Sequence, residues 1–221
     1  MKNLFFLILF FSFNICISQN EVQTLKLSQA AIELTHQNVV YDPSYFSINY
    51  PNGDVPKGKG VCTDVVIRAY RKLGIDLQKL VHEDMKANFD KYPSKRIWGL
   101  SRTDKNIDHR RVPNLERFFE RKGMSKPAIR DRESFIAGDI VSWRLPGNLP
   151  HIGIVSDRKA EDGTPLIIHN IGAGAREENI LFTYQMTGHY RPALDLLKLG
   201  NRPGMENLDI RLVTIHRREG T

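Results

Sequence analysis

The sequence predicts an α+β domain, with helices in its first half and an antiparallel sheet in its second half. Apolar residues recur at helical spacing in several segments up to Gly123, whereas between Phe135 and His169 they alternate with polar residues in short runs separated by glycine and proline. Helices followed by strands are typical of the α+β class. The chain has 221 residues, enough for one sizeable domain whose core needs no disulfide.

Residues 1–18 are expected to be a signal peptide. A short, positively charged start precedes the apolar run Leu4 to Ile17, and small residues at Cys16 and Ser18 suit cleavage after Ser18. The run is shorter than the about 20 residues of a membrane span. We therefore expect an exported protein, periplasmic or secreted, without a stable span. The segment Phe13-Asn14-Ile15 lacks the small residue that precedes a lipid-modified cysteine, which disfavours a lipoprotein anchor.

Two helices are expected on either side of a loop. The first covers Val22 to Gln37, where apolar residues recur on one face. Residues 41–60 contain three prolines and several turn-forming residues, so they predict a loop. From Thr63 to Leu73 apolar positions again recur at helical spacing, and Gly74 marks the helix end.

Cys62 is the one cysteine left after removal of the leader, and it falls in the first turn of the second helix. A single cysteine in an exported protein cannot form an internal disulfide. Amide hydrogens and the dipole at a helix N-terminus stabilise a thiolate, so we expect a lowered thiol pKa, and the same amides could hold an oxyanion. The alternative is a small buried side chain with no chemistry.

A long polar stretch, residues 76–112, is expected to hold two short helical pieces and several turns, and such insertions often line a cleft. Pro113 then begins a short helix that Gly123 ends. Strands are expected at Phe135, Asp139–Trp143, His151–Val155 and Leu166–His169. Beyond Pro192, a short helix at Ala193–Leu199 and a last strand at Asn207–His216 are expected.

Two histidines on the expected strands complete a pattern with the cysteine. A cysteine nucleophile needs a neutral imidazole as general base, and that imidazole needs a third polar group to fix its tautomer. Cys62, His151 and His169 could supply these roles in chain order. Each histidine taken alone is more often structural, so the pattern is more informative than its members.

Four segments together resemble the NlpC/P60 cysteine peptidases of the papain-like superfamily. They are Gly60-Val61-Cys62-Thr63-Asp64, Ala137 to Trp143, His151 to Asp157, and Ile167-Ile168-His169. More narrowly, the sequence is similar to the exported bacterial DUF1287 (YijF-like) family. That likeness depends on Leu80 to Met85, Asn106 to Leu115 and His169 to Ala175, and the resemblance spans roughly residues 25 to 191.

The resemblance implies a papain-like NlpC/P60-type fold, with the nucleophile helix packed on an antiparallel sheet. It implies Cys62 as nucleophile, His151 as general base and acid, and His169 as the orienting group, acting on a peptide of the bacterial cell wall. The catalytic domain would cover residues 19–191, and residues 192–221 would be a C-terminal extension of unknown role. The usual motif reads Asp-Cys-Ser-Gly, whereas this chain reads Val61-Cys62-Thr63-Asp64, so contacts near the nucleophile and the bond cleaved could differ.

Several polar residues are candidates for substrate binding. Arginines bind carboxylates bidentately, and wall stem peptides carry several carboxylates, so Arg110 or Arg111 could recognise one. A solvated loop or an internal salt bridge would explain them equally well. Asp64 could instead stabilise the first helical turn, and Trp98 could belong to the core. The full set of expected substrate contacts is Asp64, Trp98, His109, Arg110, Arg111 and Asn170.

The net charge of +7 favours an anionic partner, such as cell-wall polymer or a membrane surface, although a positive surface could serve only solubility. Export makes nucleic acid the least expected partner. No cofactor or metal is expected: a zinc site of Cys62, His151 and His169 matches no familiar spacing. A catalytically silent binding module and an acyltransferase remain alternatives to a hydrolase, because an acyl-enzyme can react with water, an amine or an alcohol.

Overall fold

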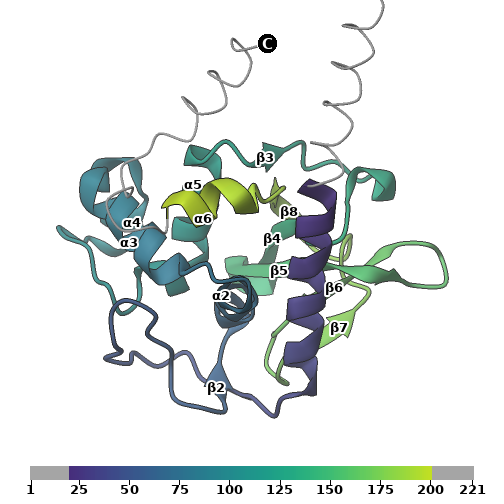
Figure 1. Ribbon diagram of the computed structural model, residues 1–221, viewed down its shortest axis with the longest axis horizontal. Coiled ribbons are helices and arrows are strands. Elements are labelled where there is room, and N and C mark those ends of the chain that lie inside the picture. Colours follow the sequence, from purple (N-terminus) through teal and green to yellow (C-terminus); the bar gives the residue numbers. More distant parts are fainter. Residues whose placement is uncertain (1–19, 201–221) are drawn as a thin grey trace, which may run out of the picture.

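Helices pack on one face of a six-stranded antiparallel sheet in the computed structural model, which describes residues 20–200 (Figure 1). The sheet has the strand order β3-β8-β4-β5-β6-β7. Its strands are β3 (Ser125–Lys126), β4 (Ile140–Leu145), β5 (Leu149–Lys159), β6 (Pro165–His169), β7 (Arg176–Glu178) and β8 (Gln185–Tyr190). The α+β prediction is therefore confirmed.

The helical elements precede the sheet in sequence, apart from two short turns among the strands and a last helix. They are a first helix over residues 20–32, η1 (Glu33–His36), α2 (Cys62–Lys72), α3 (Leu77–Ala87), η2 (Phe89–Lys91), α4 (Ser94–Trp98), η3 (Asp108–Arg110), α5 (Val112–Arg121), η4 (Arg132–Ser134), η5 (Pro146–Asn148) and α6 (Leu194–Gly200). Two short parallel strands, β1 (Val40–Tyr41) and β2 (Lys59–Gly60), pair just before α2.

The main core lies between the helices and the sheet. Alternation sends Ile152 and Ile154 of β5 to the helical face, where they join the buried apolar residues of α2, α3 and α5. Figure 1 shows α2 nearly end-on, next to the sheet. On the opposite face of the sheet a smaller core surrounds Trp143 and Val155. Both faces of the central strands are thus covered.

α2 begins where the sequence predicts. Val61 has extended backbone, and the Asp64 carboxylate accepts a hydrogen bond from the Val61 N–H at 2.7 Å, as in a capping box. The helix ends before Gly74, whose φ of +77° is the left-handed conformation favoured by glycine after a helix. Cys62 is the first residue of this helix.

Three parts of the secondary structure differ from the prediction. The polar stretch contains the eleven-residue helix α3, because the Asp76 side chain caps it at Gln78 N and its apolar face packs in the core. Phe135 is not in a strand: it follows η4, which Asp131 caps, and packs in the smaller core. Strands β1, β2, β3, β7 and β8 were not predicted: the first three have two residues each, and neither β7 nor β8 shows apolar alternation.

The predicted C-terminal helix is present as α6, and its Leu194 and Leu197 belong to the main core. The expected strand at 207–216 and the expected leader at 1–18 lie outside the described residues. Among residues 20–200, no helix is both long enough and apolar enough to cross a membrane.

Candidate active site

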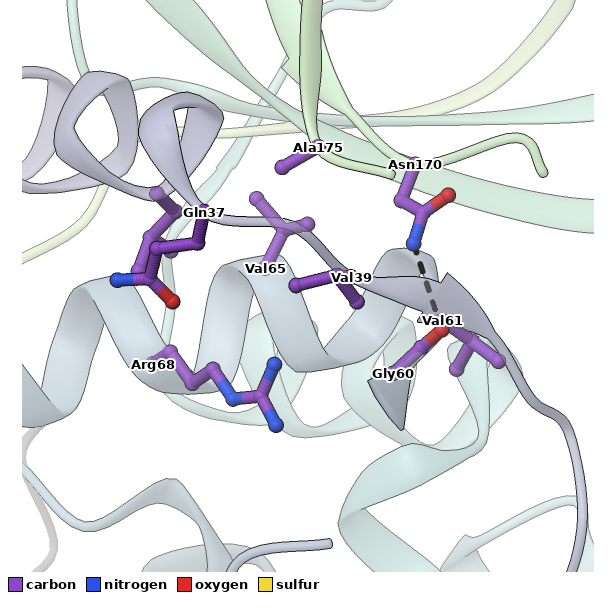
Figure 2. A pocket seen from close by; sticks show the side chains of 9 residues that line it. Gln37, Val39, Gly60, Val61, Val65, Arg68, Asn170 and Ala175 are labelled. Atoms are coloured by element: carbon purple, nitrogen blue, oxygen red, sulfur yellow. Dashed lines mark hydrogen bonds between the residues drawn. The ribbon is translucent and has the colours of Figure 1, made fainter. Parts of the chain in front are cut away.

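Two short strands deliver Cys62 to the start of α2. β1 pairs in parallel with β2, aligning Tyr41 with Gly60. The Asn170 amide, at the end of β6, donates to the Gly60 carbonyl at 3.3 Å (Figure 2). Asn170, expected to bind substrate, is 1% exposed and ties the nucleophile loop to the sheet. A cavity of about 10 Å³, room for about one water molecule, lies beside this contact.

A buried ion pair supports the same turn from the other side. Arg110 Nε and Nη2 each lie 3.0 Å from an Asp64 oxygen, and both side chains are almost fully buried. The other Arg110 donors reach the carbonyls of Ser44 and Asp42. Asp64 thus stabilises the first turn of α2, which was the alternative to substrate binding in the sequence analysis. Arg110 forms an internal salt bridge, which was the alternative to carboxylate recognition.

The two histidines meet across neighbouring strands. His151 Nε2 lies 3.0 Å from His169 Nδ1, and both rings are buried. Gly153 lies two residues after His151 on β5 and faces His169: a Cβ there would lie 3.1 Å from the His169 Cβ and 2.7 Å from an Ile167 methyl. The missing side chain leaves room for the rings to approach. Trp143 of β4 is the cross-strand partner of His151. Its ring centroid lies 6.0 Å from that of the His151 ring.

The thiol lies against the strand that carries His151. The backbone N–H groups of Ile152, Thr63 and Cys62 itself stabilise the thiolate form. No hydrogen bond joins the thiol and the His151 ring within residues 20–200. Since His151 Nε2 is engaged by His169, Nδ1 is the atom left to accept a thiol proton. Catalytic hydrogen bonds often shorten only when substrate binds.

The expected lowering of the thiol pKa is wrong for this structure. Burial raises the pKa of Cys62 to about 11, because desolvation outweighs the backbone N–H groups that favour the thiolate. Burial, assisted by the nearby His169, lowers the pKa of His151 to about 3. At neutral pH the resting pair is therefore a thiol and a neutral imidazole, not a thiolate and an imidazolium.

Arg111 and Trp98 form a partly exposed pair. The Arg111 guanidinium carbon lies 4.4 Å from the Trp98 ring centroid, a cation–π geometry. Arg111 Nη1 has no hydrogen-bond partner among the described residues, and Asp108 Oδ1 is 3.7 Å away. The Thr63 hydroxyl in α2 donates to the carbonyl of Arg110, the residue before Arg111, at 3.2 Å.

His109 is placed differently from the expectation of a substrate contact. Its side chain is 2% exposed, and burial lowers its pKa to about 3, with the Arg110 charge acting in the same direction. It therefore stays neutral inside the protein.

Two features of the site carry no local sequence signal. Tyr41 lies near Cys62 because β1 pairs with β2, which aligns Tyr41 with Gly60. Burial raises the pKa of the Tyr41 hydroxyl, and the charges of the nearby Cys62 and Asp64 act in the same direction. An open groove of about 480 Å³ also shares Leu34, Gln37 and Arg68 with the small cavity near Gly60. Four of its nine lining residues are basic, Lys57, Arg68, Arg71 and Lys72, and Arg68 and Arg71 form ion pairs with Asp54 in the same lining.

Within the part of the chain that the structure describes, no three His, Cys, Asp or Glu side chains are arranged to hold a metal ion. The fold and the site define an α+β protein with a buried cysteine at a helix N-terminus and a hydrogen-bonded histidine pair on the adjoining sheet.

This chain belongs to the DUF1287 family, described as a domain of unknown function, whose model matches residues 28–192. It is 56% identical over 167 residues to "Uncharacterized protein YijF" of Escherichia coli (strain K12), a match covering 76% of this chain and 80% of that protein. The family predicted from the sequence motifs is thus confirmed.

A solved structure is also similar. "Structure of NlpC1 from Trichomonas vaginalis" matches with a TM-score of 0.40 at 14% identity, covering 75% of this chain and 43% of that chain. This chain therefore matches less than half of the solved protein.

Proposed function

We propose that this protein is an exported papain-like cysteine hydrolase of the NlpC/P60 type, which cleaves an amide bond in a cell-wall peptide. The observation that carries the proposal is the buried Cys62 at the N-terminus of α2, packed on the strand that holds the His151–His169 pair. The proposal requires the Cys62 thiol and the His151 ring to meet at the start of β5, where the thiol lies against the Ile152 N–H and His169 holds the other side of the base.

The neutral resting pair determines the order of proton transfers. As Cys62 Sγ attacks the amide carbon, His151 Nδ1 takes the thiol proton, and the resulting imidazolium gives it to the departing amine nitrogen. The N–H groups of Cys62 and Thr63 at the start of α2, which favour the thiolate, would stabilise the oxyanion in this mechanism. Water then attacks the thioester while His151 accepts its proton, which releases the carboxylic acid and restores the thiol.

The charge near the site supports an anionic peptide as substrate. The basic groove shares Arg68 with the cavity beside Gly60, so it extends along α2 from the nucleophile loop. A second cation near the site is Arg111, whose partly exposed guanidinium is stacked on Trp98 and lies 3.7 Å from the Asp108 carboxylate. Stem peptides of the wall carry carboxylates that suit both features. We do not expect nucleic acid as a partner.

Digestion of purified peptidoglycan tests the proposal. Wild-type protein without residues 1–18 should release peptide fragments that mass spectrometry identifies, and Cys62→Ala and His151→Ala should release none. His36→Ala, at an exposed histidine of η1, is the matched control and should retain wild-type activity. Release by Cys62→Ala at the wild-type rate would refute the nucleophile assignment.

The absence of a thiol–imidazole hydrogen bond within residues 20–200 favours one alternative, a catalytically silent module that binds wall peptides. Wild type and Cys62→Ala would then sediment equally with peptidoglycan, and neither would release fragments. An acyltransferase is a third candidate: fragments would appear only when an amine or alcohol acceptor is added, and the acceptor would be found in the product.

A further inference from the structure

A carboxylate extends the histidine pair toward the edge of the sheet. Glu178 Oε2, on the edge strand β7, lies 2.8 Å from His169 Nε2, and His169 Nδ1 lies 3.0 Å from His151 Nε2. We propose that Glu178 is a positioning residue that fixes the tautomers of both imidazoles and so leaves His151 Nδ1 free to accept the Cys62 proton. This inference rests on the proposed function and adds a fourth residue to its triad.

Strand register places Glu178 for this contact. His169 pairs with Arg176 and Ile167 pairs with Glu178, so Glu178 is the diagonal neighbour of His169. Residues two apart on a strand share a face, which puts Glu178 on the face of the His169 ring. Glu177 points to the other face, where it binds Ser156 and Arg158.

The Glu178 carboxylate determines which nitrogen of each imidazole carries the proton. An ionised carboxylate only accepts hydrogen bonds, so it favours the His169 tautomer with the proton on Nε2. Nδ1 of His169 is then an acceptor, and His151 must donate to it from Nε2. The lone pair of His151 is therefore on Nδ1. With the opposite His169 tautomer, Nδ1–H would donate to His151 Nε2, and His151 Nδ1 would carry a proton and could not act as base.

Glu178 is the acidic group that lies beside the outer nitrogen of the His169 ring, Nε2. His169 Nε2 has no in-line hydrogen bond, and Glu178 is its ion-pair neighbour. The charged residue opposite His169, Arg176, directs its Nε to the Ala173 carbonyl instead. Burial lowers the pKa of His169, while the Glu178 carboxylate acts to raise it. Glu178 would also stabilise the positive charge that reaches His151 during attack.

The test compares Glu178→Gln with Glu177→Gln, the same change at the adjacent position on the opposite face. The first readout is the imidazole ¹⁵N chemical shifts, which report the tautomer and need no substrate. Wild type and Glu177→Gln should show His169 and His151 protonated on Nε2. Glu178→Gln should show a mixture of tautomers for both rings, because an amide can donate as well as accept.

The second readout is alkylation of Cys62 by iodoacetamide in protein without residues 1–18, which has one thiol. Glu178→Gln should slow alkylation about 10- to 100-fold at neutral pH. Loss of a buried triad carboxylate lowers the rate roughly 10⁴-fold, and a smaller effect is expected here because the Glu178 side chain is 41% exposed. Glu178→Asp, which keeps the charge, should recover part of the rate. Glu177→Gln should react like wild type.

Wild-type tautomers and alkylation rates in Glu178→Gln would overturn the inference. The two proposals fail separately. If the tautomers shift but wild type cleaves no wall peptide, the role of Glu178 stands and the proposed function fails. If wild type and Glu178→Gln cleave peptidoglycan equally with unchanged tautomers, the proposed function stands and the role of Glu178 fails.

Discussion

The buried pair of Arg110 and Asp64 should contribute strongly to stability. Arg110→Met would leave the Asp64 carboxylate, 3% exposed, without the guanidinium that now contacts both of its oxygens at 3.0 Å. Removing one partner of a buried ion pair costs about 3–5 kcal/mol. For a domain of this size, where 1 kcal/mol corresponds to about 2–4 °C, the melting temperature should fall by roughly 6–20 °C.

Urea unfolding followed by circular dichroism measures this loss, and a double-mutant cycle isolates its origin. The double variant Asp64→Asn/Arg110→Met no longer buries an unpaired charge, so it should be less destabilised than the sum of its two single variants. Arg117→Met is the control, because the Arg117–Glu120 pair is exposed and should contribute at most about 1 kcal/mol. A loss below about 1 kcal/mol for Arg110→Met, or strict additivity in the cycle, would refute the reasoning.

Three further predictions concern the site. Because burial raises the pKa of Cys62 to about 11 and lowers that of His151 to about 3, the neutral pair persists between these values, so alkylation assisted by His151 should change little from about pH 5 to about pH 9; a rate that rises about tenfold per pH unit in that range would mean that free thiolate reacts without His151. Gly153→Ala places a methyl group against Ile167 and His169, so it should lower the free energy of unfolding by about 1–3 kcal/mol and slow peptide cleavage, and wild-type values in both assays would contradict the packing argument. Arg111→Met should raise KM for peptide substrates with little change in kcat, whereas Arg117→Met should change neither; an unaltered KM in Arg111→Met would exclude carboxylate recognition by this residue.

Local pattern was sufficient for the parts of the fold that depend on neighbours in sequence. The start of α2 at Cys62 follows from a capping carboxylate three residues after Val61 and from apolar spacing, and both operate within one or two helical turns. The strands that carry His151 and His169 were recognised by alternation for the same reason. Edge strand β7 has no buried face to impose a pattern, so it was missed, and Glu178 was missed with it.

The sequence by itself determined the family, the α+β class and the identity of the nucleophile and histidine candidates, because these depend on residue type and short-range spacing. Only the tertiary structure decided which polar groups meet. It paired Arg110 with Asp64, directed Asn170 to the Gly60 carbonyl, and placed Glu178 beside His169. Burial, which no local pattern encodes, also reversed the expected shift of the Cys62 pKa, since desolvation depends on all the elements that surround the sulfur.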